Sequence, residues 1–586
     1  MMRATARASA LAGLLAAFAS CDGGNPAEAA GTAYFALTSP PVGFEPLEAF
    51  LISNGIMQRQ VLETLTEYTL DPADEFAVRP LLAESWEHST DGMTWTFTLR
   101  ADARFHDPLD PPLWPDRERA VEAADVVASW VQHADARDAD SNTWSAYAGL
   151  FRGLDALHEA LDGPEDEAVL QAAQREGVEG IRALDARRVR LILNHPDGFL
   201  LQRLASQAFA VIPAERAFGA PADRRDRPVG SAPFALASWD PGQSAVFRAV
   251  PGWRDPPPVS ERGRRLPETV RFDLVRESAT RALLFEQGRL DRLSLGGDAL
   301  GAYLKDGRLK PEPAARGIRL NLLRQPELVL VVFNWRDPVI GSVPGDPDLQ
   351  RRRRALRRAL ALACPTDGWL QLIRAGAGGV PVRRFLPPVV PEAAALPEYP
   401  WRGQDLERAR AALVEAGFPG GAGLPELTFD LTGSDAPSLS FGELYVANLR
   451  AIGVDCAARA NEWNALRKRL SRGEFQMSLQ SWGLDWPDAA MIYTLFDSAG
   501  IGSETNLAQF GRSDFDAALA RLRAAAEPGE RARLCREMEA ILTEECVGVP
   551  LDHRVGYLLI QPWLDGAEAH PFDPIACKNL RLGQRP

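Results

Sequence analysis

The chain has 586 residues, of which 46% are hydrophobic and 25% are charged, and its formal net charge is −14 at pH 7. This composition predicts a globular protein and excludes wholesale disorder, while the length predicts more than one domain. The acidic balance argues against a nucleic-acid partner, because binding to a phosphate backbone requires a basic surface.

The N-terminus has the pattern of a bacterial export signal. Arg3 and Arg7 supply positive charge, residues 11–18 form an apolar run too short to span a bilayer, and small residues precede Cys21. This pattern resembles a lipobox, in which Cys21 would be acylated and would anchor the mature protein to a membrane. Asp22 then resembles a signal for retention at the outer, periplasmic leaflet of the inner membrane. A plain secretory signal cleaved near the same position is the alternative, and both interpretations predict export.

Strict alternation of residue types predicts a half-buried β-strand over residues 93–99. Three threonines occupy one face of this strand, and Asp91-Gly92 before it supplies the residues that favour a turn. The opposite, apolar face consists of Met93, Trp95, Phe97 and Leu99.

The rest of the chain alternates between strand and helix patterns, which is typical of an α/β protein. Residues 328–333 form a continuous apolar run, which predicts a strand buried on both faces. Ser513 is expected to cap the last of the clearest helices. These helices are expected around residues 123–134, 406–416, 442–452 and 515–526.

The cysteine and histidine spacings match neither a metal site nor an enzyme motif. Besides Cys21 there are five cysteines, an odd number that cannot all pair within the chain, and we expect most of them to be buried. The seven histidines show no HExxH spacing, and no GxSxG or GxxxxGK[ST] motif occurs. We therefore predict no enzyme activity, no metal and no cofactor. The five cysteines are Cys364, Cys456, Cys535, Cys546 and Cys577.

Several short segments occur in an order found in one protein family. They are Glu84-Ser85-Trp86, Phe105-His106, Val229–Phe234, Phe285–Asp291 and Phe333-Asn334. Together with the strand at 93–99, they resemble the extracellular solute-binding proteins, family 5, which are the peptide-binding components of ABC importers. The resemblance runs from about Thr32 to the C-terminus. Cys364-Pro365-Thr366 departs from the Ile-Asp-Arg that usually ends the corresponding helix.

The resemblance implies an α/β fold of the type II periplasmic-binding-protein class, with two lobes and an extra inserted domain. The lobes would close by hinge motion around a ligand, and the closed protein would dock, as a monomer, on the permease subunits of a transporter. Trp95 and Phe97 are then expected in the core of the inserted domain. The expected boundaries are 1–21 for the signal, 33–75, 226–315 and 549–586 for lobe I, 76–225 for the inserted domain, and 316–548 for lobe II.

The segment Ser481–Asp488 is the main candidate for ligand contact. In peptide-binding relatives an Asp at the position of Asp485 pairs with the α-ammonium group of the ligand, and such a bond is strong in a desolvated cleft. Trp482 and Trp486 flank it and could line a pocket, although burial in a core explains them equally well. The alternative for Asp485 and Asp488 is a turn before Pro487 or a cap on the next helix.

Three further places are candidates by resemblance. Gly43 and Phe44 lie in a segment that resembles a loop at the ligand edge, where backbone groups would extend a bound peptide as an extra strand. Arg383 and Arg384 could hold a ligand carboxylate, or could simply be solvated at the surface. Trp463 could form a pocket wall or belong to the core.

The sequence therefore predicts an exported substrate-binding protein that captures a peptide or a peptide-like amine in an interlobe cleft and delivers it to a membrane permease. One alternative is the same scaffold with a non-peptide ligand, such as a metal chelate, haem, an opine or a sugar. The other is a peptide-handling chaperone or hydrolase of the cell envelope.

Overall fold

The computed structural model describes most of the chain. The described residues are 31–49, 51–70, 76–135, 137, 143–161, 166–219, 224–254, 263–296, 298–374, 384–401, 403–433, 436–503, 505–573 and 575–585. The predictions for the export signal, for Cys21 and for Arg383 lie outside these residues.

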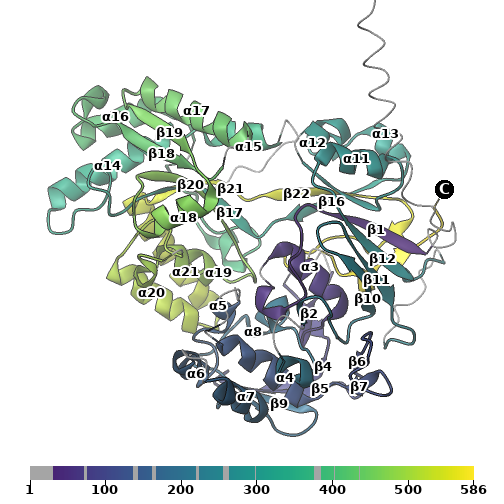
Figure 1. The fold of residues 1–586 in the computed structure, drawn as a ribbon. Coiled ribbons are helices and arrows are strands. Elements are labelled where there is room, and N and C mark those ends of the chain that lie inside the picture. Colours follow the sequence, from purple (N-terminus) through teal and green to yellow (C-terminus); the bar gives the residue numbers. More distant parts are fainter. Residues whose placement is uncertain are drawn as a thin grey trace, which may run out of the picture.

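The first described strand joins three strands from residues 234–274 in a four-stranded sheet, here called the amino-terminal sheet. Its order is β1 (Thr32–Leu37), β12 (Thr269–Leu274), β11 (Ser244–Ala249) and β10 (Phe234–Asp240), and β1 runs parallel to β12. Helix α3 (Ile52–Val61) packs on it through Met57, in a core that contains Phe35, Phe247 and Phe272 (Figure 1).

A second four-stranded sheet, the inserted sheet, lies between β1 and β10 in the sequence. Its order is β4 (Ala83–His88), β5 (Thr94–Leu99), β9 (Arg188–Ile192) and β8 (Ile181–Ala183). Helices α4 (Ala123–Val131) and α7 (Glu167–Glu176) accompany it. The predicted apolar face is confirmed, since Phe97 and Leu99 are buried in its core and the half-buried Trp95 packs against that core.

The largest sheet, the central sheet, has five strands. Their order is β19 (Cys456–Ala460), β18 (Leu427–Leu431), β20 (Met477–Gly483), β17 (Glu327–Phe333) and β21 (Gly548–Asp552). Strand β17 is buried on both faces, as its apolar run predicts, because alternate residues enter two different cores. Helices α14 (Pro347–Ala363), α16 (Leu406–Ala416) and α17 (Ala436–Ala451) contribute to one core. Helices α19 (Ala489–Tyr493), α20 (Ser513–Ala524) and α21 (Pro528–Glu545) contribute to the other.

Two chain crossings connect the central sheet to the amino-terminal part of the molecule. Strand β16 (Arg319–Arg324) leads into β17, and β21 leads into β22 (Val555–Ile560). Strand β22 pairs with both β16 and β13 (Arg292–Leu295), and the Gln325 N–H donates to the Arg554 carbonyl at 2.8 Å. In Figure 1 strand β22 extends from the half that contains the central sheet toward the half that contains the amino-terminal sheet.

Apart from the 3₁₀ helices, the remaining helices and strands of the described residues are short. They are β2 (Thr66–Tyr68), β3 (Val78–Pro80), β6 (Arg104–His106), β7 (Glu118–Ala120), α5 (Trp144–Tyr147), α6 (Leu154–Ala160), α8 (Leu200–Arg203), α9 (Ala214–Ala217), α11 (Ser278–Glu286), α12 (Asp298–Tyr303), β14 (Leu304–Lys305), β15 (Arg308–Leu309), α13 (Pro311–Ala315), α15 (Thr366–Arg374), α18 (Trp463–Ser471), β23 (Leu564–Asp565) and β24 (Arg581–Leu582). Among all described helices, none is both long enough and apolar enough to cross a membrane.

The predicted cap at Ser513 is wrong. Ser513 is the first residue of α20, and the N-cap is Arg512, which provides no side-chain capping bond. The Arg512 guanidinium is instead held by Asp514 and by Glu545 of α21, so the ion pairs organise this helix start. The expectation for the cysteines is confirmed, because the five in the described residues are buried free thiols.

Candidate functional site

The loop at residues 484–488 joins β20 to α19 and touches two different cores. Leu484 is buried in a core of the central sheet, and its N–H donates to the Pro326 carbonyl at 2.7 Å. Trp486, two residues later, is buried in the core of the inserted sheet. Asp485 therefore lies at the seam between the central sheet and the inserted sheet.

The Asp485 carboxylate has no hydrogen bond and no ion pair with any of the residues that the structure describes. The side chain is half-buried, and the surrounding protein removes enough water that burial raises the pKa of Asp485 to about 7. Removing a carboxylate from water without a partner is costly, and such groups are concentrated at functional sites. In its ionised form this carboxylate can accept a hydrogen bond from a cationic donor.

The two tryptophans on either side of Asp485 also have unused polar groups. Trp482 is half-buried against a core of the central sheet, and Trp486 is 5% exposed. The indole N–H groups of both are buried and find no acceptor in the described part of the chain. Buried donors are nearly always bonded, so these two indole N–H groups are each able to donate to an acceptor outside the described residues.

Tyr68, from the other half of the molecule, lies near enough to Asp485 for their charges to interact. Burial raises the pKa of Tyr68 well above its usual value; the charge of Arg59 lowers it, and those of Asp573 and Asp485 raise it. The Tyr68 ring stacks on His570 at 4.5 Å and on Phe572 at 5.6 Å between ring centroids. Phe572 in turn packs against a core of the central sheet. These aromatic residues had no signal in the sequence, because Tyr68 lies about 500 residues before His570 and Phe572.

Asp488 has a structural role. Its carboxylate accepts a hydrogen bond from the Ala490 N–H at 3.0 Å and so caps α19. It also pairs with Arg531 at 2.6 Å, and Arg531 pairs with Glu392 at 2.6 Å. The interpretation of Asp488 as a cap is confirmed, whereas Arg531 was missed because nothing near it in the sequence marks it.

Gly43 and Phe44 are packed inside the amino-terminal part of the molecule. A Cβ on Gly43 would lie 2.2 Å from the Arg225 Cγ, and the Phe44 N–H donates to the Arg225 carbonyl at 2.8 Å. The Phe44 ring is buried and meets Trp239 edge-on at 5.4 Å. The structure thus places the Phe44 side chain in the core and uses its N–H within the protein.

Arg384 and Trp463 lie in the half of the molecule that contains the central sheet. The Arg384 guanidinium donates to the Ala393 carbonyl, and the Arg384 carbonyl is 3.1 Å from the His553 Nε2. Arg384 therefore has a local partner already. Trp463 is the first residue of α18, after the capping side chain of Glu462. The ligand roles proposed for these residues stay predictions.

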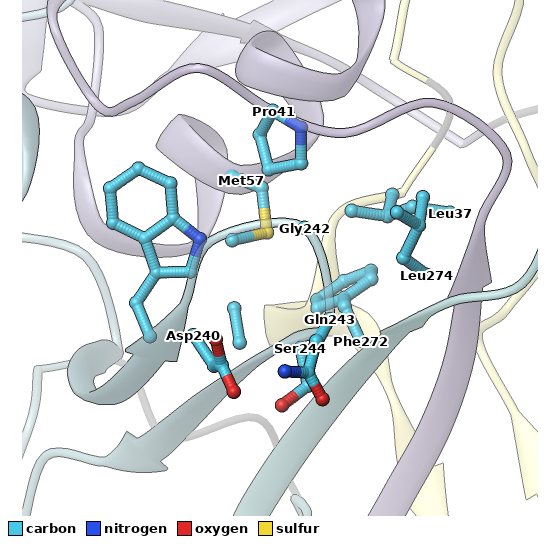
Figure 2. Close-up of a pocket in the computed structure, with 11 residues that line it drawn as sticks. Leu37, Pro41, Met57, Asp240, Gly242, Gln243, Ser244, Phe272 and Leu274 are labelled. Atoms are coloured by element: carbon cyan, nitrogen blue, oxygen red, sulfur yellow. The ribbon is translucent and has the colours of Figure 1, made fainter.

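A surface pocket of about 210 Å³ lies elsewhere, beside the amino-terminal sheet. Figure 2 shows Pro41 and Met57 above the pocket, Leu37 and Leu274 to its right, and Asp240, Ser244 and Phe272 below it. The pocket contains none of the candidate ligand residues. Within the described residues, no group of three or more His, Cys, Asp or Glu side chains is placed to hold a metal ion.

The chain is similar to curated proteins along most of its length. Heme-binding protein A of Haemophilus influenzae is 26% identical over 558 residues, which cover 92% of this chain and 90% of that protein. Di/tripeptide-binding protein 2 of Pseudomonas aeruginosa is 25% identical, with 81% of each chain covered. The Haemophilus influenzae OppA complex with the peptide RPPGFSPFR has a TM-score of 0.67 at 20% identity, and the match covers 94% of this chain and 99% of that one.

The family comparison covers more than half of the chain. Residues 77–504 match the family described as "Bacterial extracellular solute-binding proteins, family 5 Middle". The structural neighbours are type II periplasmic binding proteins, which confirms the predicted fold class. The chain is therefore a member of the bacterial extracellular solute-binding proteins, family 5, whose members bind substrates for transport.

Proposed function

We propose that this protein captures a peptide or a peptide-like amine at the 482–488 loop and delivers it to the permease subunits of an ABC transporter, without catalysis. The observation that carries the proposal is the Asp485 carboxylate, which has no partner among the described residues and whose pKa is raised to about 7 by burial. A ligand ammonium group would restore the missing charge partner and favour the ionised form.

The neighbours of Asp485 support a peptide-like ligand. The orphan N–H groups of Trp482 and Trp486 would donate to carbonyl or carboxylate oxygens of the ligand. Tyr68 and the rings stacked on it would form an apolar wall on the opposite side. Relatives named for di/tripeptide binding, and an OppA neighbour solved with a bound peptide, support the same class.

The two lobes would close around this loop by rotation about the chain crossings. Strand pairing supports two small changes to the expected boundaries. Residues 319–324 pair with β22 and would belong to lobe I, and residues 548–552 pair with β17 and would belong to lobe II. The hinge would then lie near Gln325 and Arg554, where the two crossings are hydrogen-bonded to each other.

The export signal supports a periplasmic location. We propose that Cys21 carries a lipid anchor that tethers a monomer to the outer leaflet of the inner membrane, with a cleaved secretory signal as the alternative. Mass spectrometry of the mature N-terminus would distinguish an acylated Cys21 from an unmodified terminus.

Haem is the second candidate ligand, because a relative that covers almost the whole chain is named for haem binding. Thermal unfolding of the mature protein distinguishes the two. A saturating tripeptide pool at 100 times the dissociation constant should add about 2.7 kcal/mol to the free energy of unfolding. Stabilisation by haem and not by the pool would overturn the peptide proposal.

A further inference from the structure

Arg531 in α21 is a buried side chain that joins several parts of the structure. It is 4% exposed, and its guanidinium pairs with Asp488 and with Glu392, each at 2.6 Å. Its third nitrogen, Nη1, donates to the carbonyls of Leu522 and Ala525, both at 3.1 Å. All three guanidinium nitrogens are thus bonded within the half of the molecule that contains the central sheet.

The flat face of the same guanidinium is covered from outside that half. The Phe199 ring, from the segment that precedes α8 in the inserted part of the chain, lies 4.8 Å from the Arg531 guanidinium carbon. An aromatic ring over a guanidinium gives a cation–π contact, which is stronger when water is excluded. The contact therefore docks the inserted part on a cation that already holds the Asp488 end of the ligand loop.

A second cation–π contact joins the same two parts, but here the cation belongs to the inserted part and the ring to the half with the central sheet. Arg203, at the end of α8, lies with its guanidinium 4.4 Å from the centre of the Trp486 ring, and Asp197 pairs with Arg203 at 3.1 Å. The same two segments also approach each other closely at Gly198, where an added Cβ would lie at the van der Waals distance of 3.5 Å from the Ala526 Cα. Each side thus contributes one cation and one aromatic ring.

We infer that Arg531 and Trp486, with Phe199 and Arg203 opposite them, form a clasp that positions Asp485 and docks the inserted part of the chain. The clasp holds Trp486 and Asp488, the first and the third residue after Asp485. On the other side of Asp485, the hydrogen bond from the Leu484 N–H to the Pro326 carbonyl fixes the preceding residue. Arg531 is a positioning residue in this scheme. Opening the clasp would release the turn and weaken ligand binding. Because coupling is reciprocal, a ligand held by Asp485 would stabilise the closed clasp by the same free energy by which the closed clasp stabilises the bound ligand.

This inference rests on the proposed ligand role of Asp485, but it can be tested without a ligand. Substitution of Arg531 itself would leave Asp488 and Glu392 buried without their cation and could unfold the protein. Phe199→Leu is a cleaner variant, because it removes the ring and leaves the ion pairs of Arg531 intact. Phe218→Leu is the matched control, since the Phe218 ring also lies over a guanidinium, 5.1 Å from the Arg175 carbon, but packs against the core of the amino-terminal sheet and not against the 484–488 loop.

Hydrogen exchange of the mature protein, followed by mass spectrometry, gives the first readout. Phe199→Leu should speed exchange about tenfold in residues 484–491 as well as in 197–203, because the docked turn opens more often. Phe218→Leu should leave 484–491 unchanged, and Phe199→Tyr, which keeps a ring, should restore protection. Faster exchange confined to 197–203 would overturn the clasp.

Binding of a pool of tripeptides with free amino termini gives the second readout. Phe199→Leu should weaken it about tenfold, and Phe218→Leu should not. If the wild-type protein does not bind the pool, the proposed function fails, while the exchange result still decides whether the clasp exists. Weakened exchange protection at 484–491 with unchanged pool affinity would overturn the coupling between the clasp and the ligand site.

Discussion

Two carboxylates in the same half of the molecule, one buried and one half-buried, have opposite environments. Glu545, at the end of α21, is 1% exposed and receives hydrogen bonds from Arg354, Arg357, Arg512 and Gln350. Asp485 has no such partner in the described structure, and burial raises its pKa to about 7. A carboxylate that stabilises a fold has its partners within the fold. A carboxylate that lacks such partners lowers the stability of the fold, and this is why we propose that Asp485 has a partner from outside the protein.

The largest effect should come from removing the satisfied carboxylate. Glu545→Ala would leave Arg357, which is fully buried, without its carboxylate partner. We expect the free energy of unfolding to fall by about 3–5 kcal/mol, as it does for broken buried ion pairs. Chemical denaturation measures this change. A loss below about 1 kcal/mol would show that Glu545 is not a structural anchor.

Removing the unsatisfied carboxylate should have the opposite sign. At about pH 8, Asp485→Asn should raise the free energy of unfolding of the ligand-free protein by on the order of 2 kcal/mol, because no desolvated charge remains. The same variant should lose binding of a free-amino tripeptide pool. Denaturation and calorimetric titration test the two parts. A destabilised variant would mean that Asp485 has an internal structural role.

The effect of Asp485 should also depend on pH in a defined direction. In the folded protein its pKa is raised to about 7, whereas in an unfolded chain an Asp titrates near 4. Between these values the folded state binds more protons, so the contribution of Asp485 to stability falls as pH rises from about 4 to about 7. The stability difference between wild type and Asp485→Asn should therefore be near zero at about pH 4 and should level off above about pH 7. A difference that is constant across this range would contradict the raised pKa.

The smallest effect on stability should come from removing the indole N–H of Trp482, which has no acceptor among the described residues. Trp482→Phe removes the buried indole N–H and keeps most of the ring, so stability should change by less than about 1 kcal/mol. Ligand affinity should fall by about tenfold, because one hydrogen bond to the ligand is lost. Calorimetric titration with the tripeptide pool provides the measurement. Unchanged affinity would exclude Trp482 from ligand contact.

The sequence was sufficient to predict those strands whose burial is visible in the pattern of neighbouring residues. The apolar run at 328–333 and the alternation at 93–99 each report burial through neighbouring residues, and both strands occur as predicted. Asp485 could be found only through resemblance to a family. Tyr68 and Arg531 could not be found, because their roles arise from contacts across more than a hundred residues, such as the pairing of Arg531 with Glu392. Phe44 shows the converse, since a segment that resembles a ligand loop places its aromatic side chain in the core.

The most direct test of the central claim compares two forms of one ligand pool. Tripeptides with free amino termini and the same tripeptides after N-acetylation would be titrated into the mature protein at about pH 7.4, above the raised pKa of Asp485 and below the ordinary pKa of an α-amino group. The free-amino pool should bind and should raise the unfolding temperature, while the acetylated pool should do neither, because it lacks the ammonium group that pairs with Asp485. Equal binding of both pools would contradict the assignment of Asp485 as the ligand's charge partner.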